Sequence, residues 1–168
     1  MQLDYIDMFA NLAPVDVVVV PGNHSKNTDY LVGAFLKKYY EKVNKKVNVI
    51  ESFNTERTYI PYGDKFCMVI QHGDNVSQRR LDAELHKVIM TEARSWGINP
   101  LTTTFYHFSG HLHAENSTDL GGNVVRIILS AFCPPDKWHA RNQYIGTQLK
   151  TQHTFIDRDV GRFLTLHV

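Results

Sequence analysis

The pattern of apolar and polar positions divides the chain into helices and strands. Apolar residues at helical spacing predict helices over residues 1–12, 28–43 and 79–96, with Pro14 ending the first helix and Gly97 the third. After the first helix, a β-branched run over residues 15–20 predicts a central strand that is covered on both faces. Similar apolar runs predict further strands over residues 47–50, 58–62, 66–70, 102–108, 124–129, 151–155 and 162–167.

The order of these elements predicts the fold class. The strand over residues 15–20, the helix over residues 28–43 and the strand over residues 47–50 form a βαβ unit, in which the two strands pair in parallel. Helices occur early and strands dominate late, without repeats or an evident linker. We therefore predict a single α/β domain over residues 1–168, with mixed β-sheets flanked by helices.

Charge and cysteine content exclude several classes of protein. The 168 residues include 18 Lys plus Arg and 17 Asp plus Glu, and a net charge of +1 is too small to hold nucleic acid through the overall field of the protein. Cys67 and Cys133 form no C-x-x-C pair, which argues against a disulfide scaffold or a zinc ribbon. Because no apolar run is long enough to span a bilayer, we expect a cytoplasmic protein without a membrane partner.

Three of the predicted strands end in a glycine and a histidine. In an open α/β sheet the loops at the carboxyl ends of strands converge on one crevice, so we expect these three histidine loops to lie together. Glycine in each loop allows a sharp turn and the close approach of an ion or a phosphate. The three motifs are Gly22-Asn23-His24, His72-Gly73-Asp74 and Gly110-His111-Leu112-His113.

The residue types in these loops favour a metal site. His111 and His113 are two residues apart, so an extended backbone would direct both imidazoles to the same side, where each could bind one of two neighbouring ions. Asn23 adds an amide oxygen and His72 another imidazole. A mixed set of nitrogen and oxygen ligands suits Mn, Fe, Zn or Co better than Ca.

Taken together, the three motifs resemble the last three motifs of the calcineurin-like metallophosphoesterases. The stretch from Cys133 to Arg141 also resembles a signature of bacteriophage members that are described as DNA repair exonuclease-like. The resemblance covers nearly the whole chain, from about Ile6 onward. It implies a partial calcineurin-like metallophosphoesterase sandwich, and it implies Mn as the ion, with Zn, Fe or Co as alternatives.

The resemblance also implies a role for each loop residue. Asn23, His72 and His111 would ligate one metal ion, and His113 would ligate the other. His24 would be the catalytic histidine, which contacts the phosphate or protonates the leaving oxygen.

The chain departs from the family pattern before and after the asparagine motif. Family members begin with a D-x-H motif and a G-D motif whose aspartate bridges both metals, and neither motif precedes Asn23 here. Ser25 stands where an acidic residue usually follows the asparagine-histidine pair. We therefore expect a domain that lacks its amino-terminal part, and an isolated chain that is slow or inactive because the two cations lack their shared carboxylate.

The predicted function is that of a metal-dependent phosphoesterase, a phage-encoded phosphodiesterase or nuclease that acts through metal-activated water in the host cytoplasm. Two alternatives stay open: a catalytically impaired protein that binds a metal or a nucleic acid, and one half of a split enzyme whose second polypeptide supplies the D-x-H and G-D motifs. His139 and Arg141 could contact the phosphodiester substrate, and an ordered structural loop after Pro134-Pro135 is an equal alternative. The apolar strand over residues 17–20 would have an unpaired edge, which predicts self-association or pairing with that second polypeptide.

Overall fold

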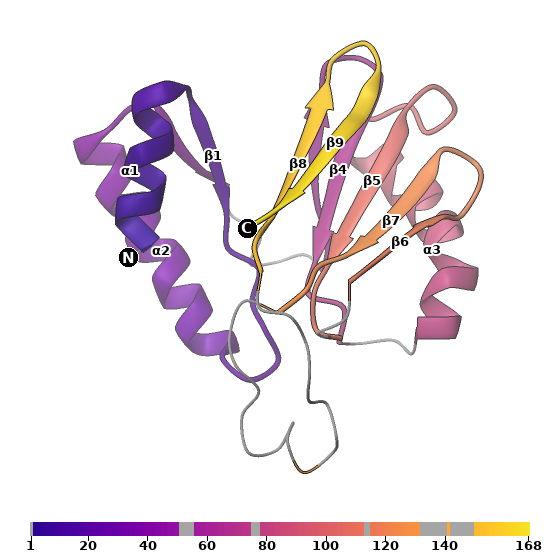
Figure 1. Cartoon of the computed structure of the whole chain (residues 1–168), viewed down its shortest axis with the longest axis horizontal. Helices are drawn as coiled ribbons and strands as arrows, with labels where there is room; N and C mark the ends of the chain where they lie inside the picture. Colours follow the sequence, from indigo (N-terminus) through magenta and orange to yellow (C-terminus); the bar gives the residue numbers. More distant parts are fainter. Residues whose placement is uncertain (1, 51–55, 75–77, 113–114, 132–140, 142–149) are drawn as a thin grey trace. The chain divides into compact units, whose positions relative to one another are not determined.

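Two helices and two short strands form the first unit of this mixed α/β chain (Figure 1). The chain divides into two compact units, residues 1–56 and residues 57–168. The structure is a computed structural model that describes residues 2–50, 56–74, 78–112, 115–131, 141 and 150–168. For residues 2 and 78–83 the description covers the backbone alone. The α/β class predicted from the sequence is confirmed.

The first unit is the predicted βαβ arrangement with a helix before it. Its elements are α1 (Gln2–Leu12), β1 (Val15–Val18), α2 (Lys26–Val43) and β2 (Val47–Ile50). β1 and β2 pair in parallel, with Val15 opposite Val47 and Val18 opposite Ile50, as expected for strands joined by a crossover helix. The helices and strands share one core, which contains the buried residues Ala10, Leu36, Tyr40, Val47 and Val49.

The prediction of a central strand covered on both faces is wrong for β1. The strand ends at Val18 instead of residue 20, and Val15, Val17 and Val18 are only half-buried. Asp16 is exposed and its carboxylate accepts a hydrogen bond from the Asn48 side chain at 2.8 Å, so this face is polar. Among the described residues β1 pairs with β2 alone, and the apolar run therefore packs on one face against the two helices.

The second unit contains a five-stranded mixed sheet. Its strands are β3 (Thr58–Tyr62), β4 (Phe66–Gln71), β5 (Thr104–Ser109), β6 (Asn116–Asp119) and β7 (Val124–Ile128). They lie in the order β3-β4-β5-β7-β6; the three inner strands run parallel and the two outer strands run antiparallel to their neighbours. Sequence reasoning missed β6, because its sequence NSTD has no apolar alternation.

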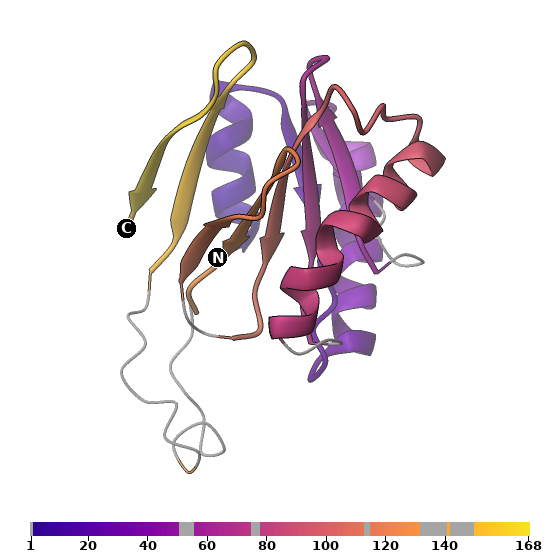
Figure 2. The same ribbon diagram turned by 90° about the vertical axis from the view of Figure 1, so that its right-hand side faces the viewer.

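This sheet is covered on both faces (Figure 2). One face packs against α3 (Gln78–Glu92) and the 3-10 turn over Ala93–Trp96, and the other against the hairpin of β8 (Gln152–Asp157) and β9 (Gly161–His167). Alternate residues along a strand face opposite layers, so Cys67 and Phe105 lie under α3 whereas Phe66 and Tyr106 lie under the hairpin. Among the described residues no helix is both long enough and apolar enough to cross a membrane.

Candidate metal site

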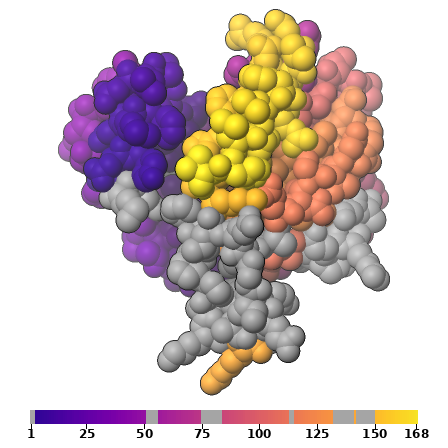
Figure 3. All heavy atoms as spheres, in the orientation of Figure 1, coloured from indigo at the N-terminus to yellow at the C-terminus, as the bar shows by residue number. Residues whose placement is uncertain are grey.

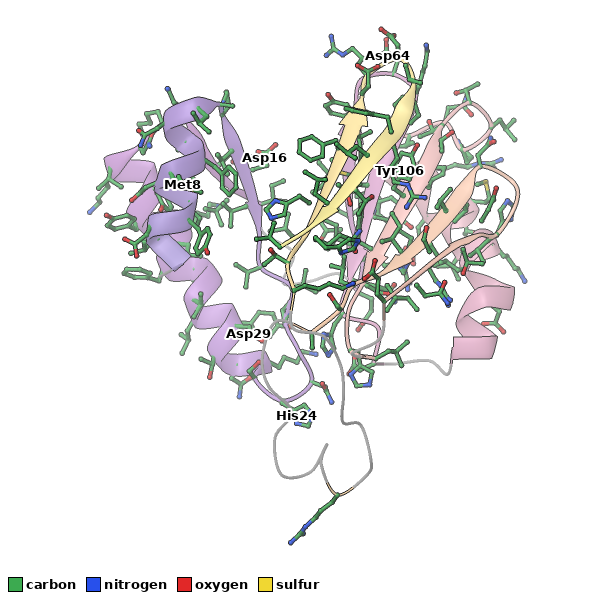
Figure 4. The ribbon with its side chains drawn as sticks, viewed as in Figure 1. Met8, Asp16, His24, Asp29, Asp64 and Tyr106 are labelled. Carbon is green, nitrogen blue, oxygen red and sulfur yellow. The ribbon has the colours of Figure 1, made fainter. Side chains whose placement is uncertain are left out.

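The first predicted motif lies in the turn that leads from β1 into α2. Asn23 and His24 are exposed in this turn, and α2 begins three residues after Asn23, at Lys26. Asp29, in the first turn of α2, accepts hydrogen bonds from the Gly22 backbone N–H at 2.9 Å and from the Ser25 hydroxyl at 2.6 Å (Figure 4). This carboxylate therefore fixes both sides of the turn that presents the two motif residues.

The second and third motifs lie side by side in the other unit. β4 and β5 are adjacent parallel strands with Gln71 opposite Ser109, so His72 and the Gly110-His111 turn leave the sheet at the same edge. The Gly110 N–H donates a hydrogen bond to the His72 carbonyl oxygen at 3.1 Å. The His72 and His111 rings are 5.1 Å apart between centroids, with an interplanar angle of 70°. The predicted convergence is confirmed for these two loops.

Two residues at this edge have a left-handed backbone. Gly73 has φ +100°, and a Cβ atom there would lie 3.3 Å from the Ser109 Cβ, so glycine is needed for the two loops to approach each other. His111 has φ +66°, which is uncommon for a residue with a side chain, although histidine adopts it more often than most. The prediction of an extended backbone at His111 is therefore wrong, because the chain turns there immediately after β5.

The other predicted site residues are Asn23, His24, His113, His139 and Arg141. His113 and His139 lie outside the described residues, and Arg141 is exposed. Asn23 and His24 belong to the first unit, whereas His72 and His111 belong to the second. No group of three or more His, Cys, Asp or Glu side chains suited to a metal ion occurs within the described part of the chain.

A polar layer that sequence reasoning missed lies between the sheet and α3. The Arg57 guanidinium donates to both carboxylate oxygens of Glu92, at 2.8 and 2.6 Å, and Tyr59 donates to the same carboxylate at 2.8 Å. The hydrogen bonds from Arg57 and Tyr59 hold the pKa of Glu92 below its usual value despite its partial burial. Arg57 also donates to the Gln71 side chain at 3.2 Å, which ties this layer to the last residue of β4, directly before His72.

His107 of β5 is fully buried and lies within the electrostatic influence of Arg57. Burial, together with the smaller effect of the positive charges of Arg57 and Arg126, lowers the pKa of His107 to about 3. Neither ring nitrogen of His107 has a hydrogen-bond partner among the described residues. His107 is therefore a neutral core residue at physiological pH.

Comparisons of the chain with protein-family models, with curated proteins and with solved structures give no match. The calcineurin-like resemblance thus rests on the sequence motifs, and the paired imidazoles at one sheet edge are the structural observation that bears on a metal site.

Proposed function

We propose that this chain is a metal-dependent phosphoesterase of the calcineurin-like class, which hydrolyses phosphodiesters by metal-activated water. The observation that carries the proposal is the pair of His72 and His111 rings at the carboxyl ends of two parallel strands. Two imidazoles that bind one ion at about 2.1 Å through nitrogen, at ordinary bond angles, have centroids roughly 5 Å apart. The separation of 5.1 Å agrees with a shared ion.

Each residue has a distinct part in this proposal. His72 and His111 would hold one ion together with Asn23, and His113 would belong to a second ion. When bound, the ion, Mn or alternatively Zn, Fe or Co, would supply an activated water and polarise the phosphoryl group. The His24 imidazole lies next to Asn23 in an exposed turn that Asp29 orders, which suits a group that contacts the phosphate or protonates the leaving oxygen.

The arrangement of the second unit supports the sandwich that this family resemblance implies. Its mixed five-stranded sheet has a helix on one face and a further β-hairpin on the other. Loops at the carboxyl edge of such a sheet are the usual place for a ligand site.

A second candidate is a protein that binds a metal or nucleic acid with impaired catalysis, alone or as half of a split enzyme. One observation favours it: within the described residues the two imidazoles have no third His, Cys, Asp or Glu side chain beside them. The two candidates differ in turnover, because only the first requires hydrolysis by this chain alone.

Metal binding to the full chain tests the assignment directly. We expect about one Mn²⁺ or Zn²⁺ per chain by calorimetry and elemental analysis, and at least a tenfold weaker affinity in the double variant His72→Ala, His111→Ala. The matched control is His86→Ala, His153→Ala, which also removes two histidines but leaves the site intact. Equal metal content in the site variant and the parent would contradict the site. Hydrolysis of an aryl phosphodiester with added Mn²⁺ then separates the two candidates.

A further inference from the structure

A pocket opens between the two β layers of the second unit. It has a volume of about 360 Å³ and lies between residues 115–117 and Ile127 on one side and Gln152 and β9 on the other. Figure 3 shows the spheres of β8 and β9, in yellow, directly beside those of β6 and β7, in orange. The volume falls in the range of pockets that bind small molecules.

The pocket lies near the same end of the sheet as the paired imidazoles. Ser109, at the end of β5, lies opposite Ile128 of β7, and Ile128 lies opposite Asn116 of β6. Residues 115–117 line the pocket. They lie two strands away from the end of β5, which is roughly 10 Å at the usual strand spacing. A ligand longer than one phosphate group could therefore extend from the imidazoles along this edge toward the pocket.

Among the charged groups at the pocket, the Arg162 guanidinium is the cation that could bind a ligand. Glu115 pairs with the Lys150 ammonium and lies 3.1 Å from His167 Nε2, so its negative charge is offset within the protein. Arg162 donates from Nη1 to the Ser117 hydroxyl at 2.9 Å, and no carboxylate among the described residues pairs with its guanidinium. A guanidinium with remaining N–H donors suits a phosphate, which accepts two parallel hydrogen bonds from it.

The aromatic residue beside Arg162 faces away from this cation. The Phe163 ring lies 6.2 Å from the ring of Phe155, on the outer face of the hairpin, whereas Arg162 reaches Ser117 of β6 on the inner face. The Ser117 and Thr165 hydroxyls, which also line the pocket, could hydrogen-bond a sugar.

We propose that this pocket binds one nucleotide of the substrate, with its phosphate on Arg162 and its sugar on the Ser117 and Thr165 hydroxyls. The choice of a nucleotide over another organic phosphate rests on the proposed phosphodiesterase function. The pocket would hold the nucleotide that neighbours the phosphodiester at His72 and His111, and it would thereby favour a nucleic-acid strand over a small phosphodiester.

Binding of AMP to the full chain in EDTA tests the pocket without any contribution from a metal. Calorimetry should show AMP binding that weakens roughly tenfold or more in Arg162→Ala, the loss expected for a charge-assisted hydrogen-bond pair. The matched control Arg158→Ala removes an exposed arginine from the β8–β9 turn, outside the pocket, and should change the affinity less than twofold. Circular dichroism of each variant checks that the fold is kept.

A second measurement keeps the test valid if Arg162→Ala does not fold. Saturation-transfer NMR should detect contact between the ribose protons and the protein, and Thr165→Val should reduce this transfer. Absence of AMP binding, equal affinity for inorganic phosphate and AMP, or unchanged binding in Arg162→Ala would overturn the nucleotide pocket. AMP binding without metal-dependent hydrolysis would instead overturn the proposed function, so the two failures are distinguishable.

Discussion

His107 makes the stability of the second unit depend on pH in a defined direction. Its ring is fully buried between the sheet and α3, and its pKa falls from the ordinary value of 6.5 to about 3 in the folded protein. Between these two values the unfolded chain binds a proton that the folded chain excludes. The contribution of the neutral His107 ring to the free energy of unfolding is therefore present in full at neutral pH. The folded state loses stability as the pH falls from 6.5 toward 3.

The size of this loss follows from the two pKa values. At pH 4.5 the unfolded imidazole is two pH units below its pKa, whereas the folded imidazole is still neutral. Each unit costs about 1.4 kcal/mol, so His107 should lower the free energy of unfolding by about 3 kcal/mol between pH 7.5 and pH 4.5. That is a large share of the ~5–15 kcal/mol that stabilises an ordinary domain.

The substitution His107→Leu removes the titrating group at nearly constant volume. Urea unfolding followed by circular dichroism, at pH 7.5 and 4.5, gives the free energy of unfolding of parent and variant. At pH 7.5 the variant should lie within about 1.5 kcal/mol of the parent, because an apolar side chain replaces a polar ring that has no hydrogen-bond partner among the described residues. At pH 4.5 the variant should have lost about 3 kcal/mol less than the parent.

Other titrating groups contribute equally to both proteins and cancel in this difference. The control His86→Gln removes a histidine from the surface of α3, where its ring contacts the Gly122 carbonyl oxygen at 3.2 Å. This control should keep the pH dependence of the parent. If His107→Leu and the parent lose the same free energy between the two pH values, the ring is not buried as a neutral group and the reasoning fails.

Two further predictions concern catalysis and packing. If metal-dependent hydrolysis is found, His24→Ala should lower turnover by roughly 10²–10⁴-fold at unchanged metal content, as expected for a proton donor that is not a ligand, and loss of metal would contradict this role. Gly161→Ala should destabilise the protein more than Gly97→Ala in thermal unfolding, because both have positive φ but only the first would place a Cβ atom 2.5 Å from the Tyr106 hydroxyl. Equal decreases in thermal stability would show that the positive φ alone, and not the contact with Tyr106, causes the destabilisation.

The local pattern of the sequence was sufficient for most helices and strands. The strands over Val47–Ile50 and Thr58–Tyr62 have the predicted bounds, because alternating or continuous apolar residues between turn residues leave few other conformations. Gly97 ends the helical segment with a left-handed backbone, as its place after Trp96 predicts. The βαβ pairing of β1 and β2 also followed from element order alone.

The same pattern gave a wrong prediction for the burial of β1 and no prediction of β6, because nonlocal contacts determine both. The five valines around Asp16 predicted a strand covered on both faces, but periodicity cannot tell how many layers pack against a strand, and β1 is only half-buried. β6 has no apolar signal, because its place beside β7 depends on backbone hydrogen bonds that any sequence can make.

The sequence by itself determined which residues stand at the ends of strands, and hence that His72 and His111 are candidates for one site. Only the tertiary structure decided that their rings lie 5.1 Å apart, since this depends on β4 and β5 being neighbours in register. It also decided the left-handed turn at His111 and the enclosure of His107 beside two arginines. Side-chain spacing along the chain is a local property, whereas register, burial and electrostatic environment are set by segments far apart in the sequence.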